Sequence, residues 1–352
     1  MTPVRLLGLG TAVPDHEVDQ DRAKCLVRAM FADSFDGLDR FVGVFDRSGV
    51  HSRSFSVPPS WFDDDHDFGE RNDRYRVEAF DLSVRAADRA IAAAAIEPAS
   101  IGAVFFVSST GVATPSLDAR LVQHLGLALH GTRRTAVFGH GCAGGVGGLG
   151  QALEWTAAQP ERCALLIATE LCSLAFRRDA ATKTDLVAAS LFADGSAAAV
   201  LGRRDGSDAP TLVGAGSTLW PDTADVMGWD VDARGLGVVL SRSVPSLVRR
   251  EFRASAEAAC RRHGTSVDDI AHHIFHPGSA GVLAALADSL GLEPDQLRWS
   301  ARVLYDHGNM SAPTALFVLE RFLAEDGGRP GEMGLISAMG PGFAAEHVVF
   351  RC

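Results

Sequence analysis

The sequence lacks three patterns that would point to a membrane, nucleic acid or metal. No window reaches 18 consecutive apolar residues, so no transmembrane helix is predicted. The chain has no basic run and a net charge of −11, which argues against nucleic acid as a partner. Its six cysteines form no CxxC pair, and the adjacent His272 and His273 would point to opposite faces of a strand, so no metal site is predicted.

Targeting and disulfide signals are also scarce. The apolar part of the N-terminal stretch is too short for a signal peptide and is typical of a strand and turn. Scattered cysteines in a chain of 352 residues favour reduced thiols. We therefore expect a cytoplasmic protein with free cysteines.

What the sequence does contain is an alternation of short apolar runs and helical patterns. This alternation predicts an α/β fold in layers, with largely parallel strand pairing. Residues 202–210 (GRRDGSDAP) are the best candidate for a linker, and the order of elements restarts after them. We expect two duplicated α/β units, residues 1–205 and 206–352.

The most informative stretch is residues 135–155, TAVFGHGCAGGVGGLGQALEW. An apolar run predicts a buried strand, a glycine turn follows, and Cys142 precedes a helical pattern with five glycines. Each helical glycine costs about 1 kcal/mol relative to alanine, so the pattern implies that another backbone packs closely. A thiol at a helix N-terminus has a lowered pKa, which suits a nucleophile. A small buried core cysteine is the alternative interpretation of Cys142 alone.

Two residues in the second unit could join Cys142 in a site. His276 follows a predicted strand and is fixed by Pro277 and Gly278, and Asn309 lies at a predicted helix start. A histidine can activate a thiol, and an amide can bind a developing oxyanion, which together suit acyl transfer through a thioester. Taken singly, His276 could be an ordinary loop histidine and Asn309 a helix N-cap.

Five motifs together resemble the chalcone and stilbene synthase family, the type III polyketide synthases of the thiolase fold. They are residues 141–145 (GCAGG), 191–199 (LFADGSAAA), 274–278 (IFHPG), 308–311 (GNMS) and 340–346 (GPGFAAE). The HPG and GPG motifs separate the chain from ketoacyl-carrier-protein synthases III. The resemblance implies a thiolase-like fold of two α/β units that form a five-layered αβαβα core.

The resemblance also implies roles for individual residues. Cys142 carries the acyl chain, His276 keeps it a thiolate as a paired imidazolium, and Asn309 with His276 binds malonyl-CoA and its enolate. The implied cavity residues are Phe192, the gatekeeper, and Val238, Ala175, Cys172, Thr114, Ser109 and Met339. The implied CoA contacts are Arg47, Arg53 and Gly278. The chemistry requires no cofactor or metal, only malonyl-CoA and an acyl-CoA starter.

Departures from the plant enzymes bear on the starter. Val238 and Ala175 replace larger phenylalanine and threonine residues, which would widen the cavity. Residues 113–118 and 170–174 resemble bacterial members that hold a long alkyl chain near Cys172 and make alkylpyrones or alkylresorcinols in secondary metabolism. Each buried methylene contributes about 0.8 kcal/mol, so we expect a long-chain fatty acyl starter. In the family, the residue at Thr114 reaches into the partner's cavity, which implies a homodimer.

Two alternatives remain open from the sequence. One is an enzyme like ketoacyl synthase III that stops after a single condensation. The other is a cysteine hydrolase or acyltransferase, against which His140 stands where a nucleophile elbow has glycine.

Overall fold

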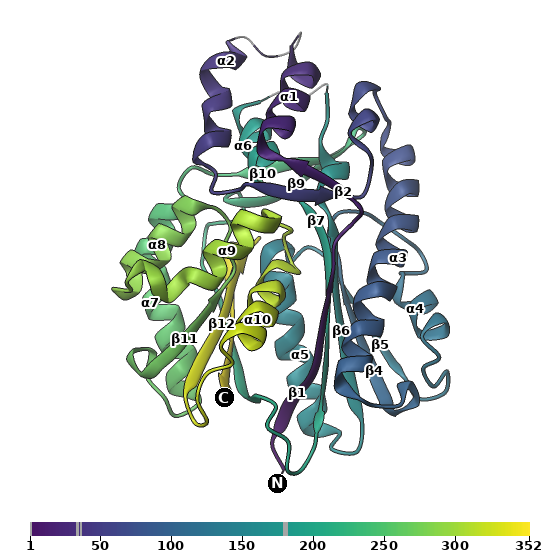
Figure 1. Ribbon diagram of the computed structural model, residues 1–352, viewed down its shortest axis with the longest axis vertical. Helices are drawn as coiled ribbons and strands as arrows, with labels where there is room; N and C mark the ends of the chain where they lie inside the picture. The colour runs from purple at the N-terminus through teal and green to yellow at the C-terminus, as the bar shows by residue number, and fades with distance from the viewer. Residues whose placement is uncertain (1, 33–34, 36, 179–181) are drawn as a thin grey trace.

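The computed structural model describes residues 2–32, 35, 37–178 and 182–352. Its main feature is a nine-stranded sheet in the order β11-β12-β13-β8-β1-β7-β6-β4-β5 (Figure 1). The first half of the chain supplies β1 (Val4–Ala12), β4 (Ile101–Val107), β5 (Arg133–Val137), β6 (Cys163–Leu171) and β7 (Asp194–Arg203). The second half supplies β8 (Thr211–Leu219), β11 (Ile270–Phe275), β12 (Met333–Gly340) and β13 (Ala344–Arg351).

The two half-sheets meet at β1 and β8, whose only registered pair is Arg5 with Thr211. The predicted boundary at 205/206 falls in the connection between β7 and β8. Expected parallel pairing is present in β4 with β5 and β6, and in β11 with β12. The prediction of largely parallel pairing is wrong for the whole sheet, because β7 and β13 run antiparallel to both of their neighbours. The connection from β12 to β13 spans three residues, which is too short for the crossover that a parallel pair needs.

Helices complete five layers around the half-sheets. The long helix α3 (Phe68–Ala94) covers the outer face of the first half-sheet. Helices α5 (Gly144–Ala158) and α10 (Thr314–Glu325) lie between the half-sheets and contact both. Helices α7 (Val244–Arg262) and α8 (Ala280–Leu290) form the other outer layer, on the left in Figure 1. The predicted αβαβα core is therefore confirmed.

The core follows these layers as three buried apolar clusters. One lies under α3, one surrounds the central helices, and one lies between the second half-sheet and the helices α7 and α8. The alanine-rich face of α3 lets this helix approach β1 closely. A Cβ on Gly8 or Gly10 would overlap the backbone of α3 at Ala90.

A cap of smaller elements covers one end of the central layer, at the top of Figure 1. It contains α1 (Gln20–Phe31), α2 (Leu38–Phe41), α6 (Lys183–Leu191), β2 (His16–Asp19), β3 (Ser52–Phe55) and the hairpin of β9 (Met227–Asp232) and β10 (Gly235–Leu240). The cap joins residues from both halves of the chain, since α6 contacts β10.

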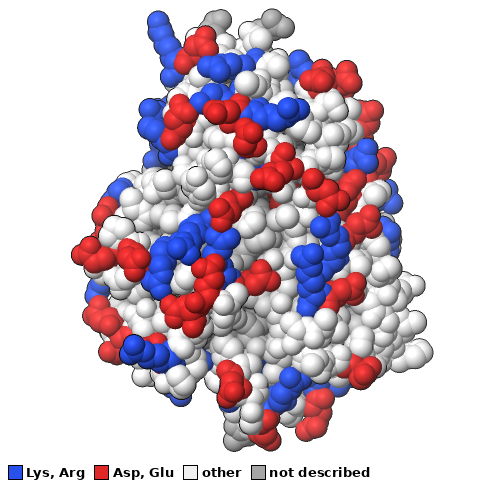
Figure 2. Space-filling model, viewed as in Figure 1, with Lys and Arg blue, Asp and Glu red and all other residues white. Residues whose placement is uncertain are grey.

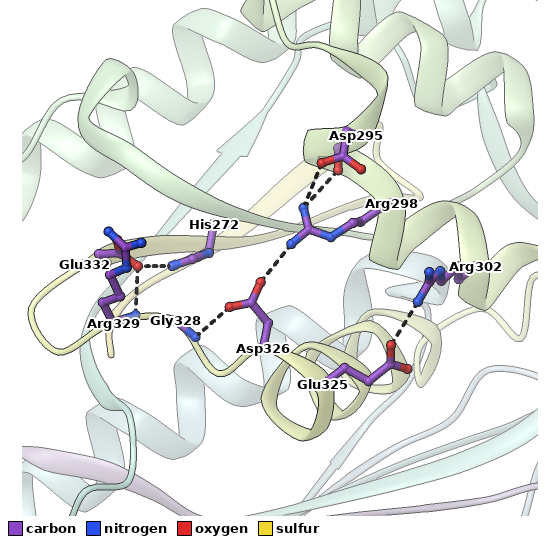
Figure 3. Close-up of polar contacts among 9 residues, drawn as sticks. All are labelled: His272, Asp295, Arg298, Arg302, Glu325, Asp326, Gly328, Arg329 and Glu332. Carbon is purple, nitrogen blue, oxygen red and sulfur yellow. Dashed lines mark hydrogen bonds and ion pairs between the residues drawn. The ribbon is translucent and has the colours of Figure 1, made fainter.

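The remaining helices lie at the periphery: α4 (Asp118–His124) beside α3, and α9 (Arg298–His307) beside α10. Ion pairs tie α9 to the end of α10, where Arg298 contacts Asp326 at 2.7 Å and Arg302 contacts Glu325 at 2.9 Å (Figure 3). Acidic and basic side chains are interspersed over the face drawn in Figure 2. Within the described ranges, no helix is long and apolar enough to cross a membrane.

Candidate active site

Cys142 lies on a short 3₁₀ turn, Gly141–Ala143, between β5 and the first residue of α5. The turn needs glycine, because Gly141 has φ = 46° and a Cβ there would come within 2.8 Å of Pro341. The predicted close backbone approach is also confirmed. A Cβ on Gly145 would overlap the carbonyl oxygen of Ala312, just before α10. The glycine-rich helix therefore lets the two central helices meet and holds Cys142 at the boundary between the two halves.

His276 and Asn309 reach the same place from the second half of the chain. His276 directly follows β11, and its backbone N–H donates to the carbonyl of Ser337 on β12 at 2.8 Å. Asn309 lies between α9 and α10, and its Oδ1 is 3.9 Å from the sulfur of Cys142. That Oδ1 also accepts from the backbone N–H of Ser311 at 2.8 Å. The N-cap interpretation of Asn309 does not hold, because α10 begins at Thr314.

The three side chains line one cavity of about 480 Å³. This volume lies within the range of about 300–1,000 Å³ that is usual for small-molecule sites. All three side chains are buried, Cys142 at 7% exposure, His276 at 5% and Asn309 at 3%. The three groups are therefore shielded from bulk water inside a cavity that opens at its rim, which suits chemistry on a thioester.

Burial determines which protonation states of Cys142 and His276 are favoured. It raises the pKa of the Cys142 thiol to about 11 and lowers the pKa of His276 to about 4. Both nitrogens of the His276 ring lack a hydrogen-bond partner among the described residues. Burial therefore opposes the thiolate–imidazolium pair that the family resemblance implied. It favours a neutral imidazole, which is the form that can accept the thiol proton.

Five of the other predicted site residues also line this cavity. Phe192 follows α6, Val238 is on β10, and Met339 is on β12. Gly278 lies two residues after His276, and its carbonyl accepts from the Asn309 amide at 3.1 Å. Arg47 is at the rim.

Four predicted cavity residues do not line it. Cys172 is buried behind the wall, and Ala175 faces a separate pocket of about 10 Å³, space for about one water molecule. Ser109 supports the nucleophile turn instead, because its hydroxyl accepts from the N–H groups of Gly139 and Gly141 at 3.3 Å. Thr114 lies in the loop after β4 and does not reach the cavity of its own subunit. Cys172, Ala175 and Ser109 therefore lie outside the lining of this cavity, and the entry of Thr114 into the partner's cavity stays a prediction.

Arg53 is also misassigned by the sequence. Its side chain is 1% exposed, and its guanidinium donates to backbone carbonyls inside the protein. It is therefore not free to contact CoA.

The cavity also has lining residues that were not predicted from the sequence, on one wall and at the rim. Met227 and Trp229 on β9 line the cavity, although no local signal distinguishes them from ordinary strand residues. Arg40, Lys183 and Arg242 stand at the rim with Arg47, and all four side chains are exposed. Among the described residues, none of the four cations forms an ion pair with an acidic side chain.

Comparison with known proteins agrees with this geometry. Residues 2–205 match the N-terminal domain of chalcone and stilbene synthases, and residues 211–352 match the C-terminal domain. The chain belongs to the chalcone and stilbene synthase family. It is a type III polyketide synthase, a decarboxylative condensing enzyme of the acyltransferase class that uses malonyl-CoA and acyl-CoA substrates.

Individual relatives cover the whole chain. A putative chalcone synthase of Bacillus subtilis is 38% identical, and the alignment covers 98% of both chains. The 1,3,6,8-tetrahydroxynaphthalene synthase of Streptomyces peucetius is 36% identical over 97% of this chain and 91% of the relative. The crystal structure of the 1,3,6,8-tetrahydroxynaphthalene synthase of Streptomyces coelicolor, a bacterial type III polyketide synthase, superposes with a TM-score of 0.93. It covers 99% of both chains at 29% identity.

Proposed function

We propose that this type III polyketide synthase loads an acyl starter on Cys142 and extends it with malonyl-CoA through His276 and Asn309. The convergence of these three buried side chains on one cavity is the observation that carries the proposal. Neutral His276 accepts the thiol proton as the Cys142 sulfur attacks the starter thioester, and the proton leaves with the CoA thiol.

Malonyl-CoA then binds with its thioester carbonyl facing His276 and Asn309. The bond to its carboxylate breaks, CO₂ leaves, and the electron pair forms an enolate whose oxygen these two side chains stabilise. The enolate carbon attacks the acyl carbonyl on Cys142, a carbon–carbon bond forms, and the thiolate leaves. Transfer of the longer chain back to Cys142 allows another cycle.

The rim cations support binding of CoA at the mouth. Arg47 was expected there, and we add Arg40, Lys183 and Arg242 because they line the same opening without acidic partners among the described residues. Their charges would attract the phosphates of CoA to a chain whose net charge is −11. Arginine suits this task, because its planar guanidinium can bind phosphate through two hydrogen bonds.

For the starter we propose a fatty acyl-CoA, with an alkylpyrone or alkylresorcinol as the product. The lining supports an apolar chain, since leucine and valine side chains of α6 and β10 form much of the wall. Long chains near Cys172 have less support, because that residue lies behind the wall. A second candidate is a ring product without an alkyl chain. It is favoured by the relatives that are named as 1,3,6,8-tetrahydroxynaphthalene synthases.

A ladder of starters distinguishes the two candidates. Purified protein is incubated with labelled malonyl-CoA and acyl-CoAs from acetyl to hexadecanoyl, or with malonyl-CoA alone, and products are identified by mass spectrometry. An alkylated product whose kcat/KM rises with chain length supports the fatty acyl starter. A ring product from malonyl-CoA alone, unaffected by added starter, would replace it with the second candidate. Equal kcat/KM for acetyl-CoA and hexadecanoyl-CoA would also refute the fatty acyl preference.

We also propose a homodimer. Strand β5 is at the edge of the sheet, and Phe138, which directly follows it, is 55% exposed. Val112, in the loop after β4, is 49% exposed. Such an exposed strand edge with apolar side chains favours pairing with a second chain. In this arrangement Thr114 contributes to the partner's cavity. Light scattering of the wild type and of Phe138→Glu tests this, and a wild-type monomer that is fully active would refute it.

A further inference from the structure

Arg53 on β3 is a buried cation that is hydrogen-bonded to the segment carrying the cavity residue Phe192. Its side chain is 1% exposed, and no acidic side chain among the described residues pairs with it. Burial lowers its pKa to about 9, so it stays protonated at neutral pH. A buried charge is tolerated only where hydrogen bonds replace water, so its partners indicate what it stabilises.

Those partners lie mostly at the C-terminal end of α6. One guanidinium nitrogen donates to the carbonyls of Ala189 and Phe192 at 2.9 and 3.0 Å. The second terminal nitrogen donates to the carbonyl of Ser190 at 2.9 Å and to the side chain of Gln20. The last carbonyls of a helix have no partner within the helix, and the helix dipole favours a cation there. Arg53 therefore fixes the point where α6 ends and the Phe192 segment begins.

The same segment holds Asn309. The backbone N–H of Asn309 donates to the carbonyl of Leu191 at 2.8 Å, and the N–H of Ala193 donates to the carbonyl of Asn309 at 2.9 Å. Phe192 and Asn309 thus form an isolated parallel bridge between the two halves of the chain. Gly308 is packed against this bridge, since a Cβ there would lie 2.9 Å from the carbonyl oxygen of Leu191 and 3.6 Å from the Cβ of Arg53.

We infer that Arg53 is a positioning residue that sets the cavity wall at Phe192 and the amide of Asn309 together. The inference rests on the proposed function, in which Asn309 stabilises the malonyl-derived enolate. Arg53 does not line the cavity, and its action passes through the backbone of residues 189–193. Its loss leaves the carbonyls of Ala189 and Phe192 without the Arg53 donor, while the carbonyl of Ser190 keeps the Gln20 amide at 3.1 Å, and the segment shifts to find new donors.

The expected consequence is selective. A displacement of about 1 Å at a catalytic group can lower a rate about 100-fold, so decarboxylation through Asn309 should fall roughly 10- to 100-fold. Loading of Cys142 should change much less, because Cys142 and His276 are held by α5 and β11, which Arg53 does not contact through any hydrogen bond among the described residues. The product distribution should shift as well, because Phe192 moves with the segment.

The test compares Arg53→Met, which keeps length but removes all donors, with Arg53→Lys, which keeps the charge and some donors. Gln20→Met is a milder probe of the same segment, because Gln20 accepts from the guanidinium, donates to the carbonyl of Ser190 at 3.1 Å and does not line the cavity. Arg302→Met is the matched control, since this arginine is 57% exposed and pairs with Glu325 on the surface. For each protein, acylation of Cys142 is followed by intact mass, decarboxylation by CO₂ release from malonyl-CoA, and products by mass spectrometry.

The inference predicts a slower CO₂ release with near-normal acylation in Arg53→Met, partial recovery in Arg53→Lys, and a smaller effect of the same kind in Gln20→Met. Equal losses of acylation and CO₂ release in all three variants would overturn it, as would wild-type behaviour in Arg53→Met. If Arg53→Met does not fold, Arg53→Lys and Gln20→Met test the inference in the same way, by whether CO₂ release falls more than Cys142 acylation. A wild type that neither releases CO₂ nor forms polyketide would refute the proposed function rather than the role of Arg53.

Discussion

The buried His347 predicts how the stability of the fold depends on pH. Its Nδ1 is 2.8 Å from the hydroxyl of Ser337 on β12, and its Nε2 is 2.8 Å from the hydroxyl of Ser255 on α7. The Ser255 hydroxyl continues to Thr218 on β8 at 2.7 Å. The ring therefore joins three strands and a helix through neutral hydroxyl groups, and no carboxylate within the described network offers a counter-charge.

Burial lowers the pKa of His347 to about 4, from an ordinary value of 6.5. Between pH 6.5 and 4, the ring of His347 is therefore protonated in the unfolded chain and neutral in the folded chain. The contribution of His347 is fully present above pH 6.5, and it is lost as the pH falls toward 4. One pKa unit corresponds to about 1.4 kcal/mol, so unfolding free energy attributable to this residue should fall by about 2 to 3 kcal/mol between pH 7.5 and 4.5.

Urea unfolding of the wild type and of His347→Gln measures this contribution. The variant keeps a donor and an acceptor for the two serine hydroxyls but cannot be protonated. The wild type should lose about 2 to 3 kcal/mol more than the variant over this pH range. Identical slopes for the wild type and His347→Gln would refute the argument.

Three further predictions concern the nucleophile, the central helices and the cavity wall. Because burial raises the pKa of Cys142 to about 11, iodoacetamide labelling should accelerate about tenfold per pH unit from pH 7 to 10. A rate that is constant from pH 6 to 8 would instead indicate a preformed thiolate. Gly145→Ala should destabilise the fold by about 1–3 kcal/mol, because the new methyl group would overlap the carbonyl of Ala312. Urea unfolding measures this loss, and Gly281→Ala is the control, because only a side-chain oxygen lies near a Cβ at that position. Trp229→Ala should enlarge the cavity and lengthen the products in mass spectra, and an unchanged product would argue against a wall role for Trp229.

The segment that carries the nucleophile, residues 135–155, was predictable from the sequence because its signals are local. A strand, a glycine turn and a glycine-rich helix occur in one run of residues. The prediction that the strand is buried is wrong, because β5 lies at the edge of the sheet and Phe138 after it is 55% exposed. The place of His276 after a strand was equally visible. Asn309 was found through its motif, but its helix begins five residues later than expected, because a loop and the Phe192 bridge intervene.

What the sequence could not show depends on contacts between distant segments. Arg53 and Arg47 are similar residues in one polar stretch, yet one is buried under α6 and the other stands at the rim. Cys172 begins the 3₁₀ turn after β6, and this turn decides whether its side chain faces the cavity. The turn has no periodic pattern from which that direction could be predicted. The wall residue Trp229 comes from a hairpin outside the main sheet, so only its packing against the cap brings it to the cavity.

The central claim is that, within one cavity, Cys142 is needed for loading and Asn309 for decarboxylation, with His276 acting in both steps. Its most direct test measures Cys142 acylation and CO₂ release from malonyl-CoA in parallel, for Cys142→Ala and Asn309→Ala beside the wild type. The account predicts that Cys142→Ala is not acylated and forms no polyketide but still releases CO₂, whereas Asn309→Ala is acylated and releases little CO₂. Normal CO₂ release and product formation in Asn309→Ala, or polyketide formation in Cys142→Ala, would contradict it.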